Sequence, residues 1–143
     1  MLTTIEKATK NFCIHQIRDD HQMVDGMTEK ESLIAYIDIA STTKSQKHRV
    51  YIASDKAFMQ RISLLFLEEE QSDEETLKDM TLETANLIIG SAKVIAEEEN
   101  NNPYTISTPH FEKLGNFDFE VDTAKTVKVG EDELSIAIKE LHE

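Results

Sequence analysis

The sequence has 143 residues, 39% of them hydrophobic, with only two prolines and four glycines. This length and composition are typical of one domain with a real hydrophobic core, and they argue against a disordered chain. The net charge is −13, from 28 acidic and 15 basic residues. Because the nucleic-acid backbone would repel such a chain, we expect no nucleic-acid partner.

The start of the chain predicts a helix over residues 3–17, with Ile5, Ala8 and Phe12 at helical spacing after a threonine pair. It lacks the basic start and apolar run of a signal peptide. No apolar stretch approaches the roughly 20 residues that cross a bilayer, so we expect no membrane insertion. Cys13 is the single cysteine and is expected to be a small buried hydrophobe. We therefore expect a cytoplasmic protein.

The rest of the chain alternates between strand and helix patterns, and a polar stretch with Gly26 is expected to be a connection. NNNP is expected to end the longest helix. The remaining predicted elements are strands at 33–40 and 48–53, helices from Ser54 or Asp55 to Leu67 and from Ser72 or Asp73 to about Glu99, and strands at 104–107, 116–121, 124–129 and 134–139.

This order predicts an α+β fold, an antiparallel or mixed sheet packed against long helices on one face. No internal repeat and no linker divides the sequence. We therefore expect residues 1–143 to form a single domain.

The longest helix has two distinct faces when each residue is advanced by about 100°. The apolar stripe that should face the core contains Leu77, Leu82, Ala85, Ile88, Ile89, Ala92, Ile95 and Ala96. The opposite face contains Asp79, Met80, Glu83, Asn86, Leu87, Gly90, Val94 and Glu97.

Two residues of this outward face are unusual inside a helix. Asn86 is disfavoured because its side chain competes for backbone hydrogen bonds. Gly90 costs roughly 1 kcal/mol relative to alanine. Either the close approach of another surface or packing against another helix would compensate for Gly90. The spacing Glu-x-x-Asn alone carries little information, because it occurs four times between Glu83 and Asn102.

The context of Glu83 and Asn86 is more specific. The stretch from Asp79 reads DMTLETANLIIGSAK, and 22 residues separate Asn86 from Pro109. This resembles the CheC/CheX/FliY family of bacterial chemotaxis phosphatases. Their signature is Asp or Ser, three residues, Glu, two residues, Asn, about 21 residues and Pro. The order of strands and helices is closest to the CheX branch, and the resemblance covers about residues 30–140.

The resemblance implies hydrolysis of the phosphoaspartate on a phosphorylated CheY-like receiver domain. Asn86 would orient the attacking water, and Glu83 would pair with the lysine in the receiver's active site. The Mg²⁺ would belong to the receiver, since the sequence shows no metal-ligand cluster of its own. A homodimer is also implied. The partner-binding residues would be Asp79, Met80, Leu87, Gly90 and Val94.

Two other functions are compatible with the sequence. The chain could be a non-catalytic binding module in a chemotaxis, flagellar-switch or other two-component pathway. More weakly, it could be an acidic oligomerisation domain. Asn86 favours the phosphatase, because a pure binding protein would not need that amide opposite the core stripe. The five histidines are scattered, with no pair at metal-ligand spacing.

Overall fold

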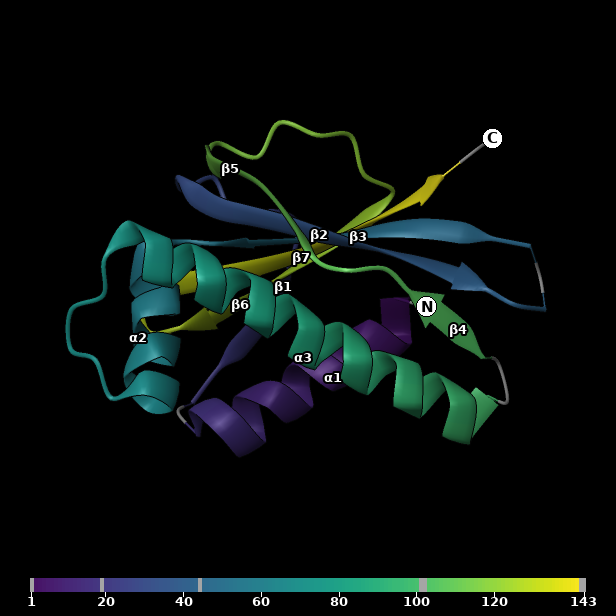
Figure 1. Ribbon diagram of the computed structural model, residues 1–143, viewed down its shortest axis with the longest axis horizontal. Helices are drawn as coiled ribbons and strands as arrows, with labels where there is room; N and C mark the ends of the chain where they lie inside the picture. Colours follow the sequence, from purple (N-terminus) through teal and green to yellow (C-terminus); the bar gives the residue numbers. More distant parts are fainter. Residues whose placement is uncertain (1, 19, 44, 101–102, 142–143) are drawn as a thin grey trace.

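The computed structural model describes residues 2–18, 20–43, 45–100 and 103–141. Figure 1 shows three helices gathered on one side of a twisted sheet. The elements in chain order are helix α1 (Leu2–Phe12), the π-helix η1 (Cys13–Ile17), strands β1 (Gln22–Asp25), β2 (Ser32–Ser41) and β3 (Lys47–Ser54), helices α2 (Lys56–Leu67) and α3 (Glu74–Asn100), and strands β4 (Tyr104–Ile106), β5 (His110–Gly115), β6 (Thr123–Val129) and β7 (Asp132–Leu141).

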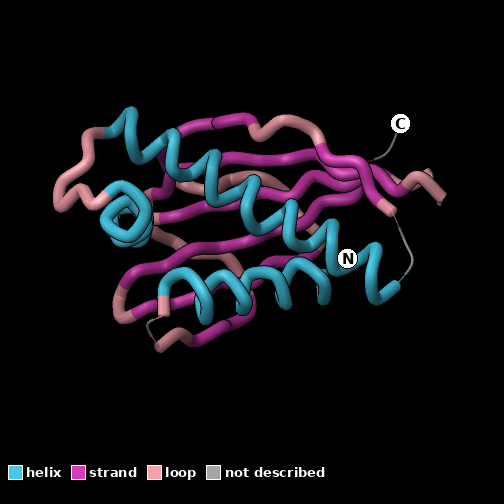
Figure 2. The backbone as a smooth tube through the Cα atoms, turned by 60° about the horizontal axis from the view of Figure 1, so that its bottom comes forward, coloured by secondary structure: helices cyan, strands magenta, loops and turns pink. Residues whose placement is uncertain are grey.

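The seven strands form one sheet in the order β1-β6-β7-β3-β2-β4, and β5 also pairs with β2. Every pairing is antiparallel, and β4 and β5 bind to different parts of the same edge of β2. Figure 2 shows the helices on one face of the strands. The α+β prediction is confirmed, and the sheet is antiparallel throughout.

The main core lies between the sheet and the helices. The strands contribute alternate residues that face the helices, as expected for a sheet with one buried side. Asp55 begins α2 by accepting a hydrogen bond from the Phe58 backbone N–H at 2.7 Å, so Asp55 rather than Ser54 is the cap. The fully buried large side chains include Leu33, Ile37, Val50, Ile52, Phe58, Ile62, Ile88, Ile89 and Leu134.

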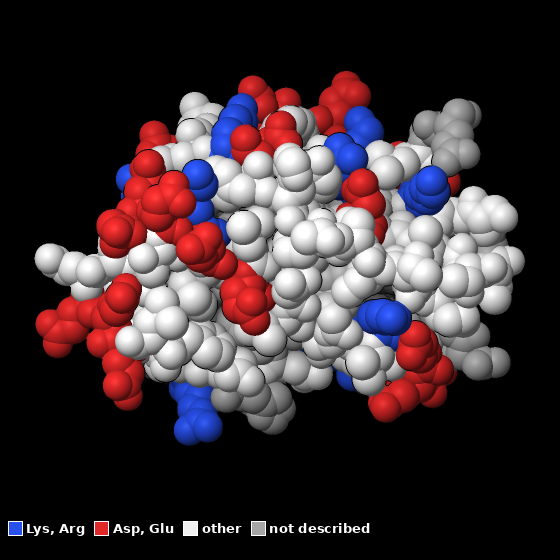
Figure 3. Space-filling view, viewed as in Figure 1, with Lys and Arg blue, Asp and Glu red and all other residues white. Residues whose placement is uncertain are grey.

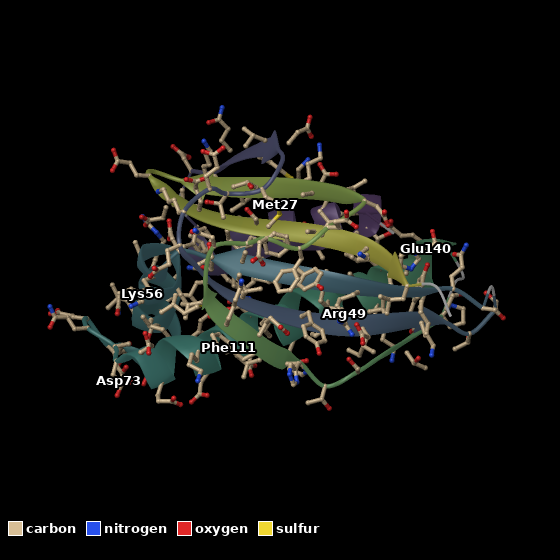
Figure 4. All side chains as sticks on the ribbon, turned by 90° about the horizontal axis from the view of Figure 1, so that it is seen from above. Met27, Arg49, Lys56, Asp73, Phe111 and Glu140 are labelled. Atoms are coloured by element: carbon tan, nitrogen blue, oxygen red, sulfur yellow. The ribbon has the colours of Figure 1, made fainter. Side chains whose placement is uncertain are left out.

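The predicted strand at 116–121 is wrong, because this segment is irregular and the strand lies before it, at His110–Gly115. Phe117 and Phe119 alternate like strand residues, yet their rings lie 5.2 Å and 5.0 Å from the ring of Tyr51. The connection after β5 crosses the sheet on the face without helices (Figures 1 and 4), and both rings pack against a second buried cluster that includes Tyr51 and Ala137. The alternation therefore reflects a connection that crosses the sheet instead of pairing with it.

The polar stretch after the first helix also contains a strand that the pattern did not predict. Gln22–Asp25 pairs with β6 at the edge of the sheet. Met23 and Val24 are half-buried and the two end residues are exposed, so the strand shows no clear apolar alternation.

The N-terminal helix is confirmed, with a π-helical end. Cys13 is fully buried there, and burial raises the pKa of its thiol to about 11. The long helix α3 ends at Asn100, and Asn101 and Asn102 of the predicted stop signal lie outside the described residues. Among the described residues, no helix combines the length and apolar character that a membrane crossing needs.

Candidate functional site

Helix α3 presents the candidate site. It begins where the side chain of Asp73 accepts a hydrogen bond from the Thr76 backbone N–H at 2.8 Å. It then crosses the helix-covered face of the sheet, with α1 beside it and α2 near its first half (Figure 1). Most of the predicted core stripe is buried, while Leu82 and Ile95 are half-buried.

Met80 is a correction to the predicted outward face. It is only 6% exposed and belongs to the main core. A helical wheel assumes one buried side, whereas the structure packs α1 and α2 against the flank of α3 on which Met80 lies. Met80 is therefore not available as a partner-binding residue.

Two buried threonines lie on the same flank and were not predicted as core residues. The hydroxyl of Thr81 donates to the Leu77 carbonyl at 2.8 Å, and that of Thr84 donates to the Met80 carbonyl at 2.7 Å. Each hydroxyl is thus satisfied one turn back within the helix, so it can be buried without an unpaired polar group.

The polar residues of the predicted face are all exposed on α3: Asp79, Glu83, Asn86 and Glu97. No hydrogen bond or ion pair within the described residues occupies the side chain of Glu83 or Asn86. Glu83 and Asn86 are one helical turn apart, so a carboxylate and a carboxamide project together. Both side chains are free to enter a site on another molecule.

Apolar residues accompany this pair. Leu87 is 39% exposed and Val94 is 50% exposed, both large values for hydrophobic side chains. Gly90 lies between them, one turn after Asn86, and a Cβ atom added there would meet nothing within 4 Å. Packing against another described element therefore does not explain Gly90. We call Asp79, Glu83, Asn86, Leu87, Gly90 and Val94 the functional face.

Pro109 lies in the short connection between β4 and β5. Both strands contact α3. The Lys78 ammonium is 4.9 Å from the centroid of the Phe111 ring of β5, which ties this strand to α3. Pro109, the proline of the sequence signature, thus lies in a segment that borders α3. This position alone does not bring Pro109 into contact with Asn86.

Two apolar features near the functional face were not predicted. A hollow of about 190 Å³ lies between α1 and α3, lined by Ala8, Asn11, Phe12, Gln16, Leu87 and Ser91. The last turn of α2 exposes Leu64, Leu65, Phe66 and Leu67. The run LLFL in the sequence indicates this exposure at the end of α2, since four consecutive side chains point in different directions around a helix and cannot all face the core.

The surface around the functional face is strongly acidic in places. Figure 3 shows acidic side chains grouped over both ends of the helical layer, with mostly uncharged surface between them. No three His, Cys, Asp or Glu side chains in the described part of the chain are placed to hold a metal ion.

Comparison with known proteins decides the family. The family model described as "Chemotaxis phosphatase CheX" matches residues 34–130, which is more than half of the chain. The chain belongs to the CheX family. The match includes all of α3 and Pro109. No curated protein matches the sequence.

Solved structures of CheX proteins share the fold. CheX from Vibrio vulnificus has a TM-score of 0.77 at 15% identity, over 96% of this chain and 97% of that one. A putative chemotaxis protein from Desulfovibrio vulgaris Hildenborough has a TM-score of 0.75 at 16% identity, over 98% and 96% of the two chains. A complex of CheX with CheY, BeF3 and Mg²⁺ from Borrelia burgdorferi matches with a TM-score of 0.69 at 14% identity, over 96% and 97%. At these identities the likeness establishes the fold of the CheX family.

Proposed function

We propose that this protein hydrolyses the phosphoaspartate of a CheY-like receiver domain, with Asn86 and Glu83 as its catalytic residues. The observation that carries the proposal is the exposed carboxylate and carboxamide pair on α3, one turn apart and without partners among the described residues. Membership of the CheX family supports it. The Borrelia complex of CheX with CheY supports a receiver domain as the substrate.

In the proposed reaction, Asn86 holds the attacking water. Its carboxamide oxygen accepts a hydrogen bond from the water, and its NH₂ group donates towards a phosphoryl oxygen. The water oxygen bonds to phosphorus as the bond from phosphorus to the receiver's aspartate oxygen breaks. The products are inorganic phosphate and a free aspartate carboxylate. Since phosphoryl transfer depends mainly on positioning and charge stabilisation, one well-placed amide can accelerate it.

Glu83 would fix the position of the receiver. Its carboxylate would pair with a lysine in the receiver's active site, and a charge-assisted hydrogen bond of this kind is directional as well as strong. Asp79, one turn earlier, would add negative charge towards the same partner. Leu87, Gly90 and Val94 would form the apolar part of the contact. The Mg²⁺ that this chemistry uses would be bound by the receiver.

The test is loss of phosphate from a phosphorylated receiver of the same genome, with wild-type protein and three variants. Asn86→Ala should abolish acceleration while binding survives, and Glu83→Ala should weaken both. Glu98→Ala, an exposed glutamate four turns along the same helix, is the matched control and should behave like wild type.

Two outcomes would contradict the proposal. If wild-type protein releases phosphate no faster than the receiver's own decay, the protein is not this phosphatase. Binding without hydrolysis would then favour the non-catalytic module. If Asn86→Ala stays fully active, the enzyme is correct and the mechanism is wrong.

A homodimer is the remaining expectation from the family. Phe117 and Phe119 already cover part of the sheet face without helices, so a partner could use only the rest of that face. We propose that two copies pair there, and sedimentation analysis of the wild-type protein tests it.

A further inference from the structure

The last turn of α2 carries a rigid apolar surface that the fold leaves uncovered. Leu64 is 48% exposed, Leu65 46%, Phe66 41% and Leu67 46%. We call these four residues the α2 patch. Apart from them, the only large hydrophobic side chains exposed among the described residues are Leu87 and Val94, which belong to the functional face. Among the described residues, the large exposed hydrophobic side chains thus lie in two places, and clustered exposed apolar side chains commonly mark an interaction site.

The α2 patch and the functional face border the same hollow through Phe12 and Leu87. The rings of Phe66 and Phe12 are stacked with centroids 6.5 Å apart. Phe12 and Leu87 line the same hollow between α1 and α3. Leu87 is the residue after Asn86. The hollow therefore lies between the functional face and the end of α2, and its lining is mixed, with Ala8, Phe12 and Leu87 beside Asn11, Gln16 and Ser91.

Hydrogen bonds at the end of α2 and in the following loop keep the α2 patch exposed. The Glu68 N–H donates to the Leu64 carbonyl at 3.0 Å, which closes α2 with a left-handed residue. The side chain of Gln60 then donates to the Glu69 carbonyl at 2.9 Å and accepts from the Ser72 N–H at 2.7 Å. These bonds hold the following loop against Gln60, so the loop does not fold over the leucines.

The size of a specific interface argues that the receiver reaches this patch. A standard specific interface buries about 800 Å² on each partner, contributed by about 20–30 residues, whereas the functional face has six. The α2 patch is the nearest exposed apolar surface that the chain offers. A second copy fits less well, because Glu68, Glu69 and Glu70 follow the patch directly and would be brought close to their own counterparts.

We infer, on the basis of the proposed function, that the α2 patch is a second docking surface for the receiver domain. The receiver covers it with an apolar surface of its own while Glu83 and Asn86 enter its active site. The patch contributes binding and orientation, and the chemistry stays with Asn86.

The test uses the double variant Leu64→Gln/Leu67→Gln, which changes two exposed residues and should leave the melting temperature close to wild type. Ala57→Gln, exposed at the other end of α2, is the matched control. Binding is measured with a receiver carrying beryllofluoride and Mg²⁺, and turnover with the phosphorylated receiver. The double variant should bind about tenfold more weakly and raise KM about tenfold. Its kcat at saturating receiver should be unchanged, and Ala57→Gln should match wild type.

The outcomes separate this inference from the proposed function. Wild-type turnover with an unchanged KM in the double variant would overturn the docking surface and leave the phosphatase intact. Absence of turnover in wild type would contradict the proposed phosphatase activity. Binding of the beryllofluoride receiver to wild type and to the double variant would still test whether the α2 patch is a docking surface. If wild type sediments as a dimer and the double variant as a monomer with normal receiver binding, a second copy covers the patch and the inference is wrong.

Discussion

Replacing Gly90 by alanine should stabilise the protein and impair its reaction with the receiver. Alanine is preferred over glycine inside a helix by about 0.8–1.0 kcal/mol. A Cβ atom at position 90 meets nothing within 4 Å, so the full gain should be realised. For a domain of this size, a gain of about 1 kcal/mol corresponds to a rise in melting temperature of about 3 °C.

The same methyl group should obstruct the receiver. Gly90 is one turn after Asn86, so a surface that receives the Asn86 side chain passes directly over it. Forcing an extra methyl group into a packed contact costs about 1–3 kcal/mol, and about 1.4 kcal/mol is a tenfold change in affinity. We therefore expect KM for the phosphorylated receiver to rise about tenfold, with a larger rise for Gly90→Leu.

The two measurements are thermal unfolding followed by circular dichroism and release of phosphate from the receiver. Glu98→Ala is the control on the same helix and should leave KM at the wild-type value. A fall in melting temperature for Gly90→Ala would refute the open space assigned to position 90. A rise in melting temperature with unchanged KM in both variants would show that the receiver does not approach Gly90.

Two further substitutions and one labelling reaction test the structure itself. Met80→Ala should lower the free energy of unfolding by about 2–5 kcal/mol in urea titrations, because Met80 is a core residue. Because burial raises the pKa of Cys13 to about 11, its thiol should stay protonated, and iodoacetamide at pH 8 should modify it only after unfolding. Asp55→Ala should cost about 2–4 kcal/mol in the same titrations, since Asp55 accepts from the backbone N–H groups of both Phe58 and Glu133. A Met80→Ala variant as stable as wild type would contradict the burial of Met80. Rapid labelling of Cys13 in the native protein would contradict the burial of its thiol. An Asp55→Ala variant as stable as wild type would contradict the two hydrogen bonds of Asp55.

Much of the fold could be predicted because the local signals agree with the global arrangement. The segments 33–40 and 48–53 pair as β2 and β3, and a two-residue turn with a positive φ at Gly130 joins β6 to β7. Short edge strands were not predictable in this way. The four residues Gln22–Asp25 are placed by backbone pairing with β6, and their side chains carry no period that could reveal it.

Part of the candidate site could also be predicted from the sequence. Periodicity correctly placed Asp79, Glu83 and Asn86 on the exposed side of α3, because a helix that packs on a sheet must turn polar residues outward. Periodicity could not reveal that two further helices pack beside α3 and bury Met80. It also could not tell that Thr84 satisfies its hydroxyl within the helix and can therefore be buried.

Met80 and Thr84, whose burial was not predicted, lie on a flank of α3, and their burial affects how the functional face would work. Met80 and Thr84 are buried on one flank of the helix, where the Thr84 hydroxyl is 3.7 Å from the Met59 sulfur of α2, and the contact of Lys78 with Phe111 ties the other flank to β5. The exposed strip that carries Glu83 and Asn86 is therefore held from both sides. In a reaction accelerated chiefly by placing a water molecule, a displacement of about 1 Å can cost about a hundredfold in rate. A helix fixed on both flanks limits such displacement, so the burial of Met80 removes this residue from the contact surface and favours a fixed position for Asn86 in the proposed reaction.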